Sequence, residues 1–142
     1  MRLLLCALLA ALLPSCASLA AEPYQRVRFE VVESFDTPGD DLTLEYVSVQ
    51  GTPLAWGSTL RVRGTYRLAS QARAVLYLGL TNGSIEEPQP HRIERGSGTF
   101  DLEVRVLRAG EPHVSLYATE APGQVLGKRR FELSARRPAP GG

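Results

Sequence analysis

The chain has 142 residues, 16 of them basic and 15 acidic, and a formal net charge of +1. This balance argues against binding to nucleic acid or to bulk anionic surfaces, which select for basic proteins. Cys6 and Cys16 are the only cysteines. The chain beyond them therefore has neither a disulfide nor a thiol site and depends on a hydrophobic core for its stability.

The first 20 residues have the pattern of an export signal. Met1-Arg2 precedes the apolar run Leu3 to Leu13, and a stretch of small residues ends at Ala20. The run is shorter than the roughly 20 residues that a membrane-spanning helix needs. We therefore expect residues 1–20 to be removed as a signal peptide and the mature protein to be exported, to the periplasm or beyond the cell.

A second cleavage position lies within the same leader. Leu13-Pro14-Ser15-Cys16 resembles a bacterial lipobox, with Pro14 where a small or aliphatic residue is usual. The resemblance implies a leader of residues 1–15 and lipidation of Cys16, whose several acyl chains would hold an outer-membrane lipoprotein firmly. The sequence leaves both cleavage positions open. In this interpretation the protein contacts a membrane only through the lipid on Cys16.

Alternation of apolar and polar residues with a period of two recurs from Gln25 to Leu133, and no stretch there keeps a helical period. Within the second predicted strand the alternation slips before Val47, as a β-bulge would cause. Turns are expected at Ser34–Asp41 and at Gly96-Ser97-Gly98. The predicted strands are Gln25–Glu33, Leu42–Gln50, Ser58–Leu68, Ala72–Thr81, a short edge strand His91–Arg95, Thr99–Leu107, Glu111–Thr119 and Val125–Leu133.

Seven or eight short strands at this spacing predict an all-β fold, an antiparallel β-sandwich over residues 24–135, followed by a disordered tail at 136–142. The pattern is similar to immunoglobulin-like and fibronectin type III modules, in fold alone. In that order Ser58–Leu68 and Thr99–Leu107 are neighbours in one sheet. Arg61, Arg63 and Arg67 would then face Asp101 and Glu103.

The other predicted sheet, formed by Ala72–Thr81, Glu111–Thr119 and Val125–Leu133, carries the best functional candidate on its outward face. Tyrosine and arginine are enriched where proteins bind one another, and aromatic rings also stack on sugars. We predict a binding module for an envelope or extracellular protein, or a glycan. Its binding face comprises Val75, Tyr77, Thr81, His113, Ser115, Tyr117, Lys128 and Arg130, with Leu126 beside them.

Two further interpretations compete with a binding module. The first is a structural lipoprotein, in which the sandwich is a spacer and Cys16 the functional residue. The second is a hydrolytic enzyme with Ser97 as nucleophile. Because Arg95-Gly96-Ser97-Gly98-Thr99 is not a Gly-x-Ser-x-Gly elbow, we expect no enzymatic activity and no cofactor.

A calcium site is the single metal candidate in the sequence. Asp36, Asp40 and Asp41 cluster around Gly39, and calcium binds oxygen ligands on loops. Their spacing matches no established calcium loop, and Asp and Gly are also ordinary turn formers.

Overall fold

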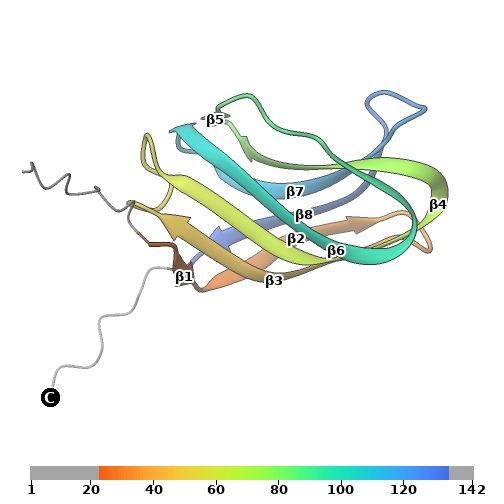
Figure 1. Cartoon of the computed structure of the whole chain (residues 1–142), viewed down its shortest axis with the longest axis horizontal. Helices are drawn as coiled ribbons and strands as arrows, with labels where there is room; N and C mark the ends of the chain where they lie inside the picture. The colour runs from red at the N-terminus through yellow and green to blue at the C-terminus, as the bar shows by residue number, and fades with distance from the viewer. Residues whose placement is uncertain (1–22, 135–142) are drawn as a thin grey trace, which may run out of the picture.

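The computed structural model describes residues 23–134, and all regular elements in that range are strands. They form one antiparallel sheet of eight strands (Figure 1), so the predicted all-β class is confirmed. Residues 23–134 include no helix able to cross a membrane. The strands are β1 (Gln25–Val27), β2 (Phe29–Asp36), β3 (Asp41–Gln50), β4 (Thr59–Thr81), β5 (Ser84–Ile85), β6 (His91–Arg108), β7 (Glu111–Ala118) and β8 (Val125–Leu133).

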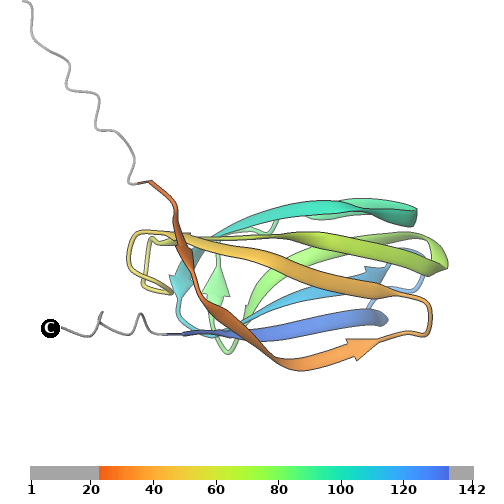
Figure 2. The same ribbon diagram turned by 90° about the horizontal axis from the view of Figure 1, so that it is seen from below.

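The sheet curves until its two ends nearly meet. Its strand order is β1-β3-β4-β7-β8-β2, with β6 beside β4 and β5 beside β6. The end strands β1 and β2 are consecutive in the chain, separated by Arg28 alone. The first part of the chain thus passes from one edge to the other and gives the molecule a nearly barrel-like shape (Figure 2).

Strand β4, 23 residues long, belongs to both layers of this curved sheet. Its first half pairs with β3, and its second half pairs with β7 from Ala74 to Thr81. Strand β6 follows β4 through the bend, with a register shift between Leu68 and Arg73. One layer therefore contains β3 with the first half of β4, and the other contains the second half of β4 with β7, β8 and β2 (Figure 2).

The sequence predicts a break within each of these two long strands, and both predictions are wrong. Ser58–Leu68 and Ala72–Thr81 belong to one strand, and the expected turn at Gly96-Ser97-Gly98 lies inside β6. Gly96 has a φ of 123°, which L side chains rarely adopt. Glycine here lets β6 bend with β4 instead of reversing direction.

The predicted bulge in Leu42–Gln50 is confirmed, and the predicted facing of arginines and acidic residues is confirmed for Arg61 and Arg63 but wrong for Arg67. The register of β3 shifts between Leu44 and Tyr46, at the predicted bulge, and returns Val47 to the interior. Across β4 and β6, both Arg61 and Arg63 pair with Asp101, at 2.6 and 3.0 Å. No ion pair is recorded for Arg67, which lies opposite Ser97.

The core lies between the two layers and is filled by the inward residues of the alternating strands. Burial of a large aliphatic or aromatic side chain contributes roughly 1.5–3 kcal/mol relative to leaving it exposed, so this core supplies the main stabilisation of a domain without disulfides. The side chains with no exposed surface are Val47, Val62, Leu76, Val106, Val114, Leu116, Leu126 and Phe131.

Candidate binding face on strands β4, β7, β8 and β2

The pairing registers place the predicted binding residues on one outer face. One row across the strands contains Tyr77, Ser115 and Lys128, and a second contains Gly79, His113 and Arg130. Val75 lies opposite Tyr117, and Thr81 lies opposite Glu111. Since the two faces of a strand alternate, residues in these registers point to the same side of the layer.

An aromatic pair occupies the centre of this face. The ring centroids of Tyr77 and Tyr117 are 5.7 Å apart, with an interplanar angle of 74°. Such edge-to-face pairs add about 0.5–1.5 kcal/mol beyond burial. Both tyrosines are half-buried, so each ring packs on the sheet and keeps part of its surface open.

Ser115 belongs to this face by register and is nevertheless only 1% exposed. It lies between Tyr77 and Lys128 in the row, and small side chains between long ones are covered by them. The prediction that Ser115 contacts a partner is therefore wrong: it supports the face from beneath.

His113 packs over the position where β4 has no side chain. A Cβ at Gly79 would lie 3.1 Å from Nε2 of His113, and Nδ1 lies 3.2 Å from Oγ1 of Thr81. Burial lowers the pKa of His113 below its ordinary 6.5; a backbone hydrogen bond with Glu111 opposes this effect, and the charge of Lys128 adds to it. The imidazole is thus favoured in its neutral form.

The two predicted cations of the face differ in their surroundings. Arg130 donates to Glu33 over 3.0 Å and to Glu111 over 3.4 Å. Its charge is therefore compensated by both neighbouring strands. Among residues 23–134 no ion pair with Lys128 is recorded, so its ammonium group is the available positive charge of this face.

Strand β2 extends the face beyond what the sequence predicted. Phe35 lies opposite Lys128 in register and is 51% exposed, and Glu33 lies opposite Arg130. The turn that the sequence predicts from Ser34 onward is wrong at its start, because Phe35 lies within β2. The alternation of Glu33 and Phe35 with Ser34 was the available signal, hidden by the nearby Pro38 and Gly39.

Leu126 does not belong to this face. The pairing of β7 with β8 shifts register between Leu116 and Tyr117, which pair with Gly127 and Val125, so Leu126 falls at the irregularity. It is fully buried in the core. A bulge changes the side to which a residue points, and regular alternation extrapolated from Lys128 missed it.

The three aspartates of the calcium candidate have protein partners of their own. Asp36 pairs with Arg129 at 2.6 Å and Asp41 with the same guanidinium at 3.2 Å. Asp40 is buried and accepts hydrogen bonds from the backbone of Ala69 and from Ser70. In residues 23–134 no group of three or more such ligands is placed to hold a metal ion, and Arg129 supplies the cation between Asp36 and Asp41.

The remaining sequence predictions fall outside the described residues. These are the leader of residues 1–20 with its two cleavage positions, the lipid site at Cys16 and the tail at 136–142. Ser97, the enzyme candidate, is exposed within β6.

Comparison of the chain with protein-family models, with curated proteins and with solved structures finds no match.

Proposed function

We propose that the protein is a non-enzymatic binding module that recognises another protein through the outer face of β2, β8, β7 and the second half of β4. The observation that carries this proposal is a single row of side chains, Phe35, Lys128, Ser115 and Tyr77, which crosses all four strands. It combines an exposed phenylalanine and a half-buried tyrosine, aromatic side chains in which protein interfaces are rich, with the ammonium group of Lys128, which forms no ion pair among residues 23–134.

The chemistry of the row favours a protein partner over a glycan. Sugar rings stack on flat aromatic platforms, whereas the rings of Tyr77 and Tyr117 stand at 74° to each other. A partner with an apolar group opposite Phe35 and a carboxylate opposite Lys128 matches the pattern. Those two contacts would combine burial of apolar area with a charge-assisted hydrogen bond.

We also propose that the curved sheet is an immunoglobulin-like sandwich displayed outside the cytoplasm. The division of β4 between two layers supports this, because it groups the predicted strands as expected for that topology. The export pattern of residues 1–20 and the lipobox resemblance at Cys16 support the location. A lipid on Cys16 would tether the binding face near a membrane.

The partner can be captured by placing a photo-crosslinking amino acid at position 35 in the native host. A matched control carries it at position 46, because Tyr46 is 46% exposed and lies on β3, in the other layer. We expect one dominant crosslinked protein from position 35 that is missing from position 46. Identical products from both positions would contradict a specific face.

A further inference from the structure

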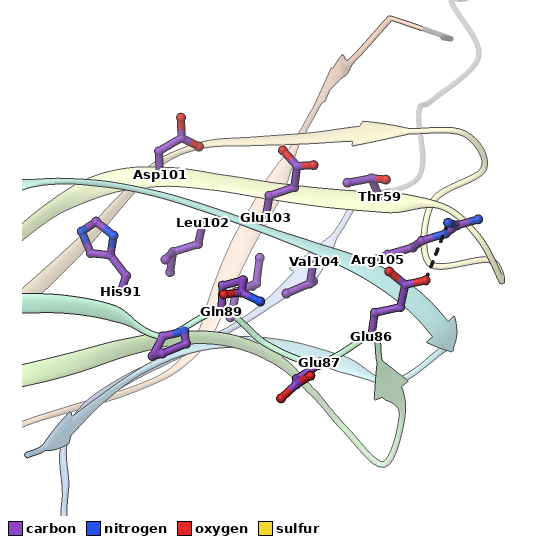
Figure 3. A pocket seen from close by; sticks show the side chains of 12 residues that line it. Thr59, Glu86, Glu87, Gln89, His91, Asp101, Leu102, Glu103, Val104 and Arg105 are labelled. Carbon is purple, nitrogen blue, oxygen red and sulfur yellow. Dashed lines mark ion pairs between the residues drawn. The ribbon is translucent and has the colours of Figure 1, made fainter.

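A groove runs along the outer edge of β6, away from the proposed binding face. It has a volume of about 580 Å³ and lies between residues 101–105 of β6 and residues 86–90 of the connection that follows β5, with His91 of β6 at one end. Figure 3 shows Leu102 and Val104 pointing from β6 into the space between the two segments. The groove thus has a partly apolar floor and polar walls.

The backbone of β6 is unpaired along this groove. Val106 exchanges both of its backbone hydrogen bonds with the β4 side, through Ser58 and Gly57. Along an antiparallel strand, the backbone groups of successive residues point alternately to the two edges. Asp101 and Glu103 each lie an odd number of residues from Val106, so their N–H and C=O groups point to the edge away from β4. Among the described residues, strand pairing at that edge is recorded only at Ser84 and Ile85.

The connection beside the edge does not close the ladder. After β5 its last backbone bond to β6 runs from the N–H of Glu86 to the carbonyl of Arg105, over 2.9 Å. Pro88 and Pro90 follow, and proline has no N–H to donate. The connection therefore stands beside β6 as a wall, and the edge stays open between them.

The charges on the groove favour a basic occupant. Glu86, Glu87, Asp101 and Glu103 line it against one cation, Arg105. Arg105 lies 3.6 Å from Glu86, and Asp101 is held by Arg61 and Arg63. Glu103 accepts a hydrogen bond from Tyr24, whose phenol is neutral because its burial, followed by this hydrogen bond and the charge of Glu103, raises its pKa to about 12. Glu103 shares the positive charge of Arg61, which lies opposite it in register and binds Asp101. Glu87 forms no ion pair among residues 23–134, so the carboxylates around the groove outnumber the cations.

We propose that the edge of β6 accepts an extended peptide segment with basic side chains, which adds to the sheet as a further strand beside Thr99–Glu103. Open edges bind extended chains through main-chain hydrogen bonds, and neighbouring side chains select the sequence. The basic side chains would lie on the outer side of the added strand, beside Asp101 and Glu103, and the apolar ones on the side of Leu102 and Val104 (Figure 3). This is a second binding surface, independent of the face that contains Phe35.

The test uses a synthetic peptide of alternating lysine and valine with capped ends, titrated into the isotope-labelled protein and followed by NMR. We expect the amide signals of Thr99, Asp101 and Glu103 to shift and their hydrogen exchange to slow on saturation. A peptide with glutamate in place of lysine is the charge control. Equal binding of both peptides, or shifts confined to other strands, would overturn the proposal.

A pair of variants at one position isolates the backbone contact. Glu103→Pro removes the outward N–H, which β4 does not use, whereas Glu103→Ala removes the same carboxylate and keeps the N–H. We expect the proline variant to bind about tenfold more weakly than the alanine variant, from the lost hydrogen bond and the bulk of the ring. Equal affinities would overturn strand addition, and the exchange measurement on the wild type decides the matter if the proline variant does not fold.

A second copy of the chain is the competing occupant of this edge. Sedimentation of the protein without peptide distinguishes it: we expect a monomer at the concentrations of the titration. A dimer that Glu103→Pro abolishes would show that the edge pairs with itself and would overturn the peptide proposal.

Discussion

His113 shows how the environment of a single side chain changes its role. Histidine on a surface is an ordinary titrating group, but here the ring lies over Gly79 and beside Thr81. Lys128 and Arg130 lie on the adjacent strand, and Arg130 is directly opposite His113 in register. Neutral imidazole fits this site, and a protonated ring would meet both burial and positive charge.

The depressed pKa of His113 makes stability dependent on pH. Above pH 6.5, the pKa of the residue in the unfolded chain, His113 is neutral in both the folded and the unfolded state. Its contribution to the free energy of unfolding is then complete. As the pH falls below 6.5, the unfolded state binds a proton that the folded state resists, so the free energy of unfolding decreases until the folded pKa is passed. Denaturant titrations between pH 7.5 and about 5, above most carboxylate pKa values, measure this loss.

The matched variants for this prediction are His113→Gln and His91→Gln, since the chain has only two histidines. We expect the loss of stability over this pH range to become smaller in His113→Gln and to persist in His91→Gln. A wild-type stability that stays constant or rises as the pH falls would contradict the buried, neutral histidine.

At the scale of strands, the sequence predicted strand structure throughout, but it predicted the extent of only β3, β7 and β8 to within a residue. Val125–Leu133 was predicted with its observed bounds, because a Pro-Gly turn precedes it and Phe131 and Leu133 mark its inward side near the end. The bend shared by β4 and β6 was mistaken for two breaks. Glycine occurs both at turns and at bends inside long strands. A turn and a bend are distinguished by whether the strand goes on pairing with the same neighbour, which the sequence pattern does not show.

The candidate face was predicted in part for the same reason. Tyr77, Tyr117 and Lys128 follow from alternation within single strands, and their registers bring them together. Phe35 was missed because the position of β2 beside β8 depends on the crossing of the chain from β1, a contact between distant segments. Burial of Ser115 depends on the length of its neighbours across strands, which periodicity does not describe.

The attachment of β8 to the turn between β2 and β3 depends on a buried charge. Arg129 is 9% exposed and donates to both Asp36 and Asp41. We expect Arg129→Met to lower the free energy of unfolding by about 1–2 kcal/mol, because the hydrogen bonds of a buried guanidinium to two carboxylates are lost while Asp36 and Asp41 stay partly open to solvent. Chemical denaturation of the purified domain measures this change.

The adjacent residue is the matched control. Arg130 also forms two ion pairs, but both of its carboxylate partners are 54% exposed, and ion pairs open to solvent contribute little. We expect Arg130→Met to leave the stability almost unchanged. Equal losses in the two variants would contradict the distinction between the buried and the exposed arginine.

For the molecule as a whole, the curved sheet keeps one edge open and presents two unlike surfaces. The chain crosses between β1 and β2, the strands at the two ends of the sheet, whereas β6 keeps an edge that is unpaired beyond β5. The outer face of β4 and β6 is crossed by the ion pairs of Asp101 with Arg61 and Arg63. The face of β2, β8, β7 and the second half of β4 instead presents Phe35, Lys128 and the tyrosine pair.

We propose that the face of β2, β8, β7 and the second half of β4 binds a protein. The most direct test is the affinity of the crosslinked partner, once purified, for the wild type, for Phe35→Ser/Lys128→Glu and for the control Tyr46→Ser. The account predicts that the double variant binds at least about tenfold more weakly, as expected for the loss of an interface anchor, while Tyr46→Ser binds as the wild type does. An affinity of the folded double variant equal to that of the wild type would contradict it.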